Sequence, residues 1–570
     1  MKRLLIMIVV VFILIQGFTL TSCNKDIVTT TNTTTTTTTT YQNQPYVPSV
    51  DNESSKELEF ALNDDGESYS VIGIGTYTGI NLIIPNEYNG KPVTAIGNMA
   101  FACYDTDTDT ILADSICYKI ESVIIPDTVT SIGAGAFGYC GNITNITLGD
   151  SVESIDDAAF CCCWSLESIE IPNSVLNIGD DAFAACLSLT SIDIPEFLTS
   201  IGNAVFDSCH SLNNITIPDS ITSIGNDAFG YCTSLTSIKI PESVVSIGDR
   251  AFRACTSLTR VEIPNSTTSI GTQAFDDCYS LIEVCNKSSL NIIAGSWDNG
   301  NIGYYAKRII TDESQSALKT VGEYIFYDDG IDVYLVKYLG DDTAIILPEY
   351  DGSKKYGIYN GAFSSEYYEN KQITSITIPD YVTSIAESAF SGCISLIEVC
   401  NKSSLNITAG STDNGHVGFY AKHIITDESE SYLRYVGDCI FYDDGTEVYL
   451  VKYLGDNKNI TFPECDNGKE YGIWQGVFAW DFNIQNVMIP DFVTSIGDNA
   501  FDCCLSLINV TISDSITSIG YYAFNECYSL ASITFRGSAE QWNIISKGRG
   551  WSYGVPTLEV ICSDGRVSIN

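Results

Sequence analysis

A 23-residue repeat constrains the fold of this chain more than any other feature of its sequence. Phenylalanines recur at this interval through the middle of the chain, and a cysteine follows each of them by three residues. The aligned positions are Phe137, Phe160, Phe183, Phe206, Phe229, Phe252 and Phe275, with Cys140, Cys163, Cys186, Cys209, Cys232, Cys255 and Cys278. Such a period indicates stacked units that bury their apolar faces only against one another.

The consensus of one unit, C-x-S-L-x-x-I-x-I-P-x-x-(V/I)-x-S-I-G-x-x-A-F-x-x, predicts one coil of a solenoid. Its segment L-x-x-I-x-I alternates like a half-buried strand, with Leu189, Ile192 and Ile194 as one example directed inward. Pro195 is expected to end that strand, because proline has no N–H to donate to a neighbouring coil. Strands of successive coils, about 4.8 Å apart, would then form a continuous parallel sheet.

The repeat resembles a known family. The run from Leu212 through Ile217-Pro218 to Phe229 and Cys232 is similar to the BspA-like leucine-rich repeats of bacterial surface proteins. The resemblance is close over 119–285, 373–400 and 484–535. It implies a β-rich leucine-rich repeat solenoid of 23-residue coils, with a concave parallel sheet and return segments that are mostly irregular or short helices.

A large block of the chain is duplicated. The segment from Leu281 to Ile292 recurs 115 residues later from Leu396 to Ile407, and Tyr327-Asp328-Asp329-Gly330 recurs in the same way. We expect each block to continue the solenoid with irregular coils. The Tyr-Asp-Asp-Gly segment predicts a hairpin with a glycine turn, which either projects as a binding ornament or packs over the edge of the core.

The N-terminus reads as an export signal and an anchor. Lys2 and Arg3 precede an apolar run that is too short to span a bilayer and suits a signal peptide. The segment ending at Cys23 resembles the lipobox of bacterial lipoproteins, which implies a lipidated Cys23; a plain secretory peptide is the alternative. The threonine-rich stretch at 29–40 has nothing to bury and predicts a disordered tether.

These features predict a linear organisation along the chain. The expected segments are a lipoprotein signal peptide at 1–22, a tether at 23–55, an N-terminal capping coil with an insertion at 56–118, regular repeats at 119–285, the irregular block at 286–372, a repeat at 373–400, the second irregular block at 401–483, repeats at 484–535, and a C-terminal cap at 536–570.

The chain has 21 cysteines, a number that in an exported protein usually indicates disulfides. Ten of them, the seven above with Cys393, Cys504 and Cys527, share one phase of the repeat. Side chains at identical phase point alike and not at each other. We therefore expect a column of buried free thiols, with disulfides between rungs as the alternative.

Metal binding is not expected. Asp105, Asp107 and Asp109 alternate like calcium ligands, but Thr110 and Ile116 stand where an EF-hand requires glycine and glutamate. The three consecutive cysteines from Cys161 to Cys163 have neither a Cys-x-x-Cys pair nor a histidine nearby in the sequence, as zinc would require.

Enzymatic activity is not expected either. The three histidines, His210, His416 and His423, occupy positions where sister repeats carry other residues, and for His210 we expect a variable exposed position. The chain lacks a Gly-x-Ser-x-Gly or a phosphate-binding glycine pattern. We therefore predict no enzyme, no cofactor and no catalytic residue.

The charge of the chain narrows its partners. Lysine and arginine total 28 against 71 aspartates and glutamates, which gives a net charge of −43. A surface this acidic repels phosphate backbones and anionic lipids, so we exclude nucleic acid and expect membrane contact only through the lipid anchor. The mature protein is expected to be a monomer in the bacterial cell envelope, exposed to the exterior.

The outward positions of the predicted strands form the candidate binding face. Its residues are Glu167, Glu170, Asp193, Asn214, Thr216, Lys239, Arg260 and Glu262. The family resemblance implies a surface adhesin for host matrix, host cells or other microbes, whose ligand is an extracellular protein. A structural envelope protein or a glycan-binding protein is the alternative.

Overall fold

The structure is a computed structural model of the chain, and it describes residues 57–105, 110–111, 116–352, 354–364, 373–463, 468–556 and 559–569. The predicted signal peptide, Cys23, the threonine tether, Asp107 and Asp109 lie outside these residues. Among the described residues, none of the helices has the length and apolar character needed to cross a bilayer.

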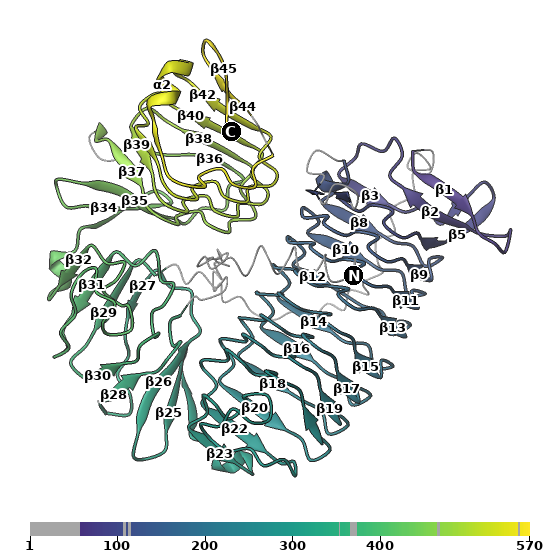
Figure 1. Cartoon of the computed structure of the whole chain (residues 1–570), viewed down its shortest axis with the longest axis horizontal. Coiled ribbons are helices and arrows are strands. Elements are labelled where there is room, and N and C mark those ends of the chain that lie inside the picture. Colours follow the sequence, from purple (N-terminus) through teal and green to yellow (C-terminus); the bar gives the residue numbers. More distant parts are fainter. Residues whose placement is uncertain are drawn as a thin grey trace, which may run out of the picture.

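The described chain is a β-solenoid in which each coil contributes one strand to each of two parallel sheets (Figure 1). The L-x-x-I-x-I segments form the first sheet, where Ser191 pairs with Asn214 of the next coil. The Ser-Ile pairs of the return segments form the second sheet, where Ser200 pairs with Ser223. Both pairings join residues 23 apart, so the prediction of a β-rich leucine-rich repeat solenoid with 23-residue coils is confirmed.

The first sheet runs along the molecule in ladders of short strands. In chain order they are β3 (Asn81–Ile83), β8 (Ser122–Ile124), β10 (Asn145–Thr147), β12 (Ser168–Ile169), β14 (Ser191–Asp193), β16 (Asn214–Thr216), β18 (Ser237–Lys239), β20 (Arg260–Ile263), β22 (Glu283–Asn286), β23 (Arg308–Ile310), β27 (Ala344–Ile346), β29 (Ser375–Ile378), β31 (Glu398–Asn401), β32 (His423–Ile425), β36 (Asn459–Thr461), β38 (Asn486–Ile489), β40 (Asn509–Ile512), β42 (Ser532–Phe535), β44 (Glu559–Cys562) and β45 (Gly565–Ser568).

The second sheet runs beside it. Its strands are β1 (Glu59–Leu62), β2 (Tyr69–Gly73), β5 (Lys91–Ile96), β9 (Ser131–Ile132), β11 (Ser154–Ile155), β13 (Asn177–Ile178), β15 (Ser200–Ile201), β17 (Ser223–Ile224), β19 (Ser246–Ile247), β21 (Ser269–Ile270), β24 (Leu318–Val321), β25 (Tyr324–Asp328), β26 (Val333–Tyr338), β28 (Tyr356–Ile358), β30 (Val382–Ile385), β33 (Leu433–Val436), β34 (Cys439–Asp443), β35 (Val448–Tyr453), β37 (Tyr471–Ile473), β39 (Val493–Ile496), β41 (Ser518–Ile519) and β43 (Ser546–Lys547).

Few elements lie outside the two sheets. The strand β4 (Glu87–Tyr88) pairs with β5, and β6 (Tyr104–Asp105) pairs with β7 (Thr110–Ile111). The described helices are all short: the 3-10 turns η2 (Cys117–Lys119), η3 (Glu313–Gln315) and η4 (Glu428–Glu430), and the α-helix α2 (Ala539–Ile544).

Antiparallel strand pairs mark the starts of three arrays in the solenoid. The N-terminal array runs from β1 to β23, the middle array from β24 to β32, and the C-terminal array from β33 to β45. Near the start of each array lies a hairpin turn in which the Oδ1 atom of an equivalent aspartate, Asp65, Asp329 or Asp444, accepts the backbone N–H group two residues on. The predicted hairpin therefore extends the second sheet, and the first described strands of the chain are a third copy of it.

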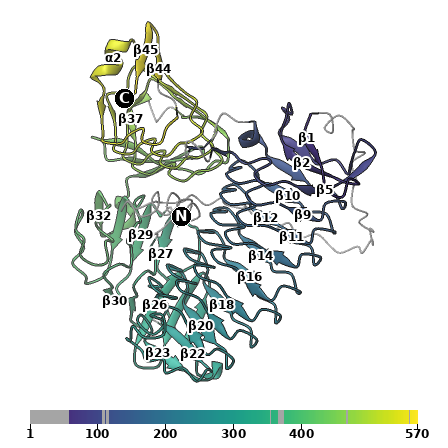
Figure 2. The ribbon, with the colours of Figure 1, turned by 45° about the vertical axis from the view of Figure 1, so that its right-hand side comes forward.

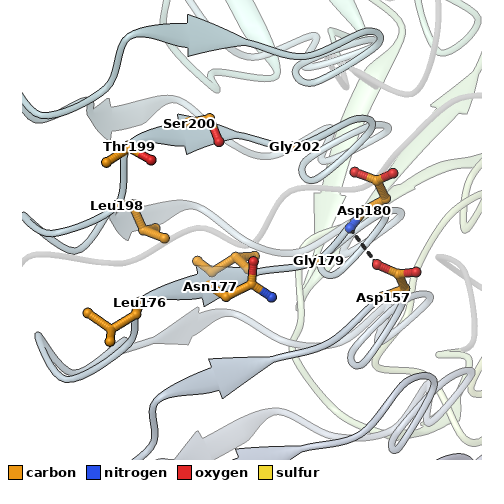
Figure 3. A pocket seen from close by; sticks show the side chains of 10 residues that line it. Asp157, Leu176, Asn177, Gly179, Asp180, Leu198, Thr199, Ser200 and Gly202 are labelled. Atoms are coloured by element: carbon orange, nitrogen blue, oxygen red, sulfur yellow. Dashed lines mark hydrogen bonds between the residues drawn. The ribbon is translucent and has the colours of Figure 1, made fainter.

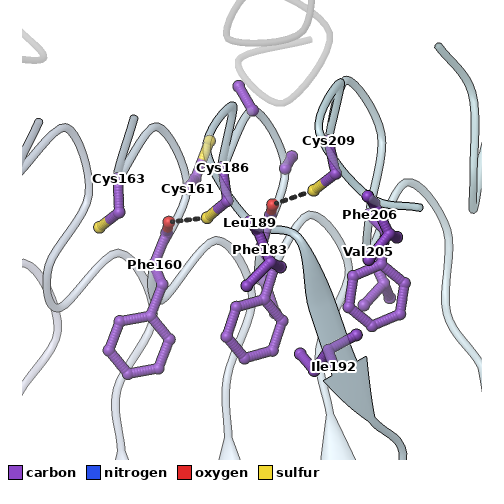
Figure 4. Close-up of a cluster of buried hydrophobic side chains, with 14 of the residues drawn as sticks. Phe160, Cys161, Cys163, Phe183, Cys186, Leu189, Ile192, Val205, Phe206 and Cys209 are labelled. Carbon is purple, nitrogen blue, oxygen red and sulfur yellow. Dashed lines mark hydrogen bonds between the residues drawn. The ribbon is translucent and has the colours of Figure 1, made fainter. Parts of the chain in front are cut away.

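The core is built from stacked identical side chains. From Phe101 to Phe275, phenylalanine rings of successive coils stack at centroid distances of 5.0 to 5.9 Å and nearly parallel (Figure 4). Each ring is fully or almost fully buried. Stacking of this kind contributes about 0.5–1.5 kcal/mol per pair beyond the burial of apolar area.

The turns between coils form a third ladder. The residue before the repeat cysteine adopts a left-handed backbone conformation in coil after coil, with φ of 62° at Tyr139, 61° at Cys162 and 57° at Ala185. Residues other than glycine are strained there. Each is fixed by hydrogen bonds to the next coil, such as Tyr139 N to Cys161 O at 2.8 Å and Cys162 N to Ala184 O at 2.7 Å.

The C-terminal array folds back against the start of the N-terminal array (Figures 1 and 2). Tyr118 Oη donates to Leu505 O at 3.1 Å, and Ser506 Oγ donates to the Oδ1 atom of Asn142 at 2.9 Å. The rings of Trp164 and Tyr528 stack with centroids 6.3 Å apart. This closure surface joins coils that lie more than 350 residues apart in the sequence.

Candidate binding surfaces

The cysteine column lines the inner side of the turns, next to the phenylalanine stack (Figure 4). All the described cysteines are buried and free of disulfides. Along the column the thiols donate to the coil before: Cys186 Sγ lies 3.3 Å from Phe160 O, and Cys209 Sγ lies 3.2 Å from Phe183 O. Burial raises the pKa of the Cys209 thiol above its usual range, which keeps the thiol protonated and unreactive.

The candidate binding face lies on the outside of the first sheet, on strands β12 to β20. Glu167, Glu170, Asp193, Asn214, Thr216 and Lys239 are exposed there. Lys239 has no ion-pair partner among the described residues. Polar and charged side chains at regular spacing make this part of the face available to an extended ligand.

The far end of the same face is less available. Arg260 lies 3.6 Å from Glu283 and 3.4 Å from Glu313 of η3, and Glu262 lies 2.6 Å from Lys287. The backbone N–H of Ala317 donates to Glu283 at 2.9 Å. The loop that carries η3 therefore covers the sheet here. The side chains of Arg260 and Glu262 are engaged in ion pairs within the protein, so they are less available to a ligand.

Sequence reasoning missed Glu283 and its counterpart Glu398. Both are buried on the outward side of the first sheet, and each accepts a backbone hydrogen bond from the covering loop, Glu398 from Tyr432 N at 3.0 Å. The signal was present, because Glu-Val-Cys-Asn occurs in both copies of the duplicated block and not in the regular repeats.

The first-sheet face of the C-terminal array is also occupied by its own side chains. Asn509 Nδ2 donates to Asn486 Oδ1 at 2.8 Å, and Ser532 Oγ donates to Asn509 Oδ1 at 2.8 Å. This ladder pairs these side chains with one another; the exposed polar residues on β12 to β18 are called the open polar face below.

The second sheet carries two shallow troughs. The N-terminal trough, residues 157, 176–180, 198–200 and 202, has a volume of about 330 Å³ and is bordered by Asp157 and Asp180 (Figure 3). The C-terminal trough, residues 449, 473–475, 495–498, 518–521 and 546–548, has a volume of about 420 Å³. Aromatic residues line the second trough and not the first.

The expected exposed position of His210 is wrong. His210 is only 3 % exposed, and its Nδ1 lies 2.8 Å from Tyr231 O. The same slot holds buried Trp164, Leu187 and Thr233 in sister coils, because it faces the inside of the turn. Burial lowers the pKa of His210 to about 3, so the ring is neutral at physiological pH.

The other histidines do not assemble into a catalytic group. His416 Nδ1 lies 3.0 Å from Glu387 O, and the ring of His423 stacks on Tyr432 at 4.5 Å with Nδ1 3.9 Å from Glu398. Over the described part of the chain, no cluster of three or more histidine, cysteine or carboxylate side chains could hold a metal ion.

The two parallel sheets, the 23-residue coils and the asparagine, cysteine and phenylalanine ladders define a leucine-rich repeat solenoid. A family model described as the BspA type leucine-rich repeat region matches residues 113–234, 199–332, 361–465 and 471–546, well over half of the chain. The chain belongs to the BspA-type leucine-rich repeat family. The comparison with curated proteins found no match.

Several solved structures are similar to this chain. A leucine-rich cell surface protein of Faecalibacterium prausnitzii is 23 % identical over 89 % of this chain and 98 % of its own, with a TM-score of 0.29. A Bacteroides ovatus leucine-rich repeat protein is 22 % identical over 86 % and 98 %, with a TM-score of 0.35. A T. pallidum leucine-rich repeat protein is 28 % identical over 36 % and 88 %, with a TM-score of 0.32. With TM-scores this low, the family assignment rests on the repeat model.

Proposed function

We propose that this protein is a surface-exposed adhesin of the bacterial envelope that binds an extracellular protein through the first sheet. The observation that carries the proposal is the open polar face on β12 to β18, where Glu167, Glu170, Asp193, Asn214 and Lys239 are exposed at regular spacing. An extended protein segment can form many modest hydrogen bonds with such a face. The acidic chain favours a basic partner.

Binding to immobilised extracellular matrix proteins tests this proposal. A soluble form that begins after Cys23, residues 24–570, is expected to be retained by at least one matrix protein, with binding that weakens as salt rises because the face is charged. Replacing Asp193 by lysine is expected to reduce that binding several-fold, since it reverses one charge at the centre of the face.

The matched control is Lys355→Glu, an exposed residue of the middle array that lies away from this face. It is expected to leave binding unchanged. Retention of no matrix protein, or equal loss of binding with both variants, would contradict the adhesin proposal and leave a structural envelope role.

We further propose that the protein is anchored by lipid on Cys23, a residue outside the described part of the chain. The support is the short apolar run and the lipobox-like segment at the N-terminus. Intact-protein mass spectrometry is expected to show loss of residues 1–22 and the added mass of acyl chains. Cys23→Ala is expected to abolish that mass and to release the protein from the membrane fraction; an unmodified mature N-terminus in the native protein would refute anchoring.

A further inference from the structure

At its first rung the C-terminal trough carries an aromatic residue where a regular coil carries glycine. In a regular coil the residue after Ser-Ile is glycine, as at Gly497 and Gly520. At the rung of β37 this position is Trp474, while the corresponding residue of the middle array is Tyr359 and that of the N-terminal array is Gly97. The C-terminal trough is therefore an open channel that ends against an aromatic wall.

The floor of the channel cannot carry side chains. A Cβ atom at Gly497 would lie 2.7 Å from the backbone nitrogen of Gln475, and one at Gly520 would lie 2.5 Å from the backbone nitrogen of Asp498. Gly548 is as tightly packed against Tyr521. The close approach of successive coils thus requires glycine at each rung, and it leaves the channel open over rungs spaced about 4.8 Å apart.

Two aromatic rings make the wall at the first rung. The ring of Tyr449 lies over Gly472, where a Cβ atom would meet its ring carbons at 3.0 Å, and packs edge-on against Trp474 at 4.8 Å. The Nε1 of Trp474 is buried and has no hydrogen-bond acceptor in the described structure. The Trp474 ring also packs against two buried apolar clusters, and Lys422 Nζ lies 5.4 Å from its centroid and 4.5 Å from that of Tyr449.

Tyr521 borders the channel two coils further on and is 56 % exposed. Between the aromatic groups lie the hydroxyls of Ser495 and Ser518 and the carboxylate of Asp498. Asp498 Oδ1 accepts from Tyr521 N at 2.7 Å, which leaves Oδ2 as an acceptor for a ligand. Lys547 donates to the backbone carbonyls of Trp542 and Ile545, so its charge is already engaged by the protein.

Separated aromatic rings with hydroxyl and carboxylate groups between them fit the chemistry of sugars. A pyranose ring presents an apolar C–H face that packs on an aromatic ring, and a rim of hydroxyls that both donate and accept. A peptide fits less well, because the channel runs across paired strands and offers no free sheet edge for strand addition. Anionic sugars fit less well too, because the lining lysine is engaged and Asp498 is negative.

We propose that the C-terminal trough binds a neutral oligosaccharide, with one sugar ring packed against Trp474 and Tyr449 and another against Tyr521. This site lies on the second sheet and is separate from the proposed protein-binding face on the first. Loss of one activity therefore leaves the other intact.

Calorimetric titration of the soluble form, residues 24–570, with maltohexaose, cellohexaose, mannohexaose and xylohexaose tests the site. At least one neutral hexasaccharide is expected to bind. Trp474→Ala and Tyr521→Ala are each expected to weaken that binding by at least about tenfold, the loss expected for one good contact. Because Tyr521 is exposed, its variant keeps the test valid if Trp474→Ala fails to fold.

Tyr435→Ala is the matched control, because Tyr435 is also an exposed tyrosine of this array, 61 % accessible on β33, but does not line the trough. It is expected to bind as the unaltered protein does. Absence of binding to every neutral hexasaccharide overturns the proposal. So does binding that survives Tyr521→Ala, and so does a preference for a hyaluronan hexasaccharide over all the neutral ones.

Discussion

Replacing Phe229 by alanine is expected to be among the most destabilising single changes in this chain. The ring is fully buried and stacks between Phe206 at 5.5 Å and Phe252 at 5.3 Å. Its removal leaves a cavity that the neighbouring coils cannot fill, because their backbones are fixed by ladders on all sides, at a cost of about 3–5 kcal/mol. Urea denaturation followed by circular dichroism measures the loss of stability.

The repeat architecture calls for a local measurement as well, since long arrays need not unfold in one step. Hydrogen exchange is expected to quicken first in the coils around Phe206 and Phe252. Phe197→Ala is the matched control, because Phe197 lies on the adjacent part of the array but is 64 % exposed; a change within about 0.5 kcal/mol is expected. Equal urea midpoints for the two variants would show that the phenylalanine stack does not contribute measurably to the free energy of unfolding.

Stability near the closure surface is expected to fall as pH rises from about 5 to 8. Burial raises the pKa of Asp502 to about 7 and that of Glu526 to about 8. Both carboxyls approach the thiol of Cys503, at 3.5 and 3.4 Å, and Cys503 packs in the core of the N-terminal array. Ionising either group in the folded state therefore places an unpaired charge against the closure surface.

The direction follows from proton linkage. Both folded pKa values lie above the values of 3.8 and 4.5 that the groups have without the fold, so the folded state binds protons more tightly. Their stabilising contribution is complete below about pH 4 and is lost as pH rises through 7 and 8. Within that window each carboxyl lowers the free energy of unfolding by about 1.4 kcal/mol per unit of pH.

Melting temperatures at pH 5.5 and 8.5 measure this effect. The acidic surface also repels itself less at low pH, so the informative comparison is with the Asp502→Asn, Glu526→Gln double variant, which cannot ionise at these positions. That variant is expected to lose most of the pH dependence. If the double variant keeps the same pH dependence as the unaltered chain, the change in melting temperature comes from the surface charge and not from Asp502 and Glu526.

The coil itself could be read from the sequence because its signals are local and repeated. Leu189, Ile192 and Ile194 are buried on the predicted strand, and Pro195 follows it. Phe229 and Cys232 are buried as their position in the repeat predicts, since equivalent residues of neighbouring coils surround each of them. The sequence predicts the hairpins at Asp328 and Asp443. It does not predict that they start new arrays, because that depends on how their strands pair with the strands of the next coil.

Individual positions within the turn were harder. The sequence predicts an exposed His210, but the residue is buried, because its slot faces the inside of the turn and accepts side chains of different size. On the candidate binding face, Lys239 is exposed as expected, whereas Arg260 is engaged by Glu283 and Glu313. The loop that carries Glu313 lies outside the 23-residue repeat, so the repeat does not predict that this loop covers Arg260.

The sequence by itself determined the 23-residue coil, the direction of its apolar side chains and the acidic, cation-poor surface, because each depends on residues within one coil or its copy. Only the tertiary structure decided three other features. These are the left-handed turn at Tyr139 and its equivalents, the aromatic wall at Trp474, and the closure of Tyr118 and Trp164 against Leu505 and Tyr528. The turn recurs every 23 residues, but the residue type at its left-handed position varies from coil to coil, and the wall and the closure join particular side chains outside the repeat consensus.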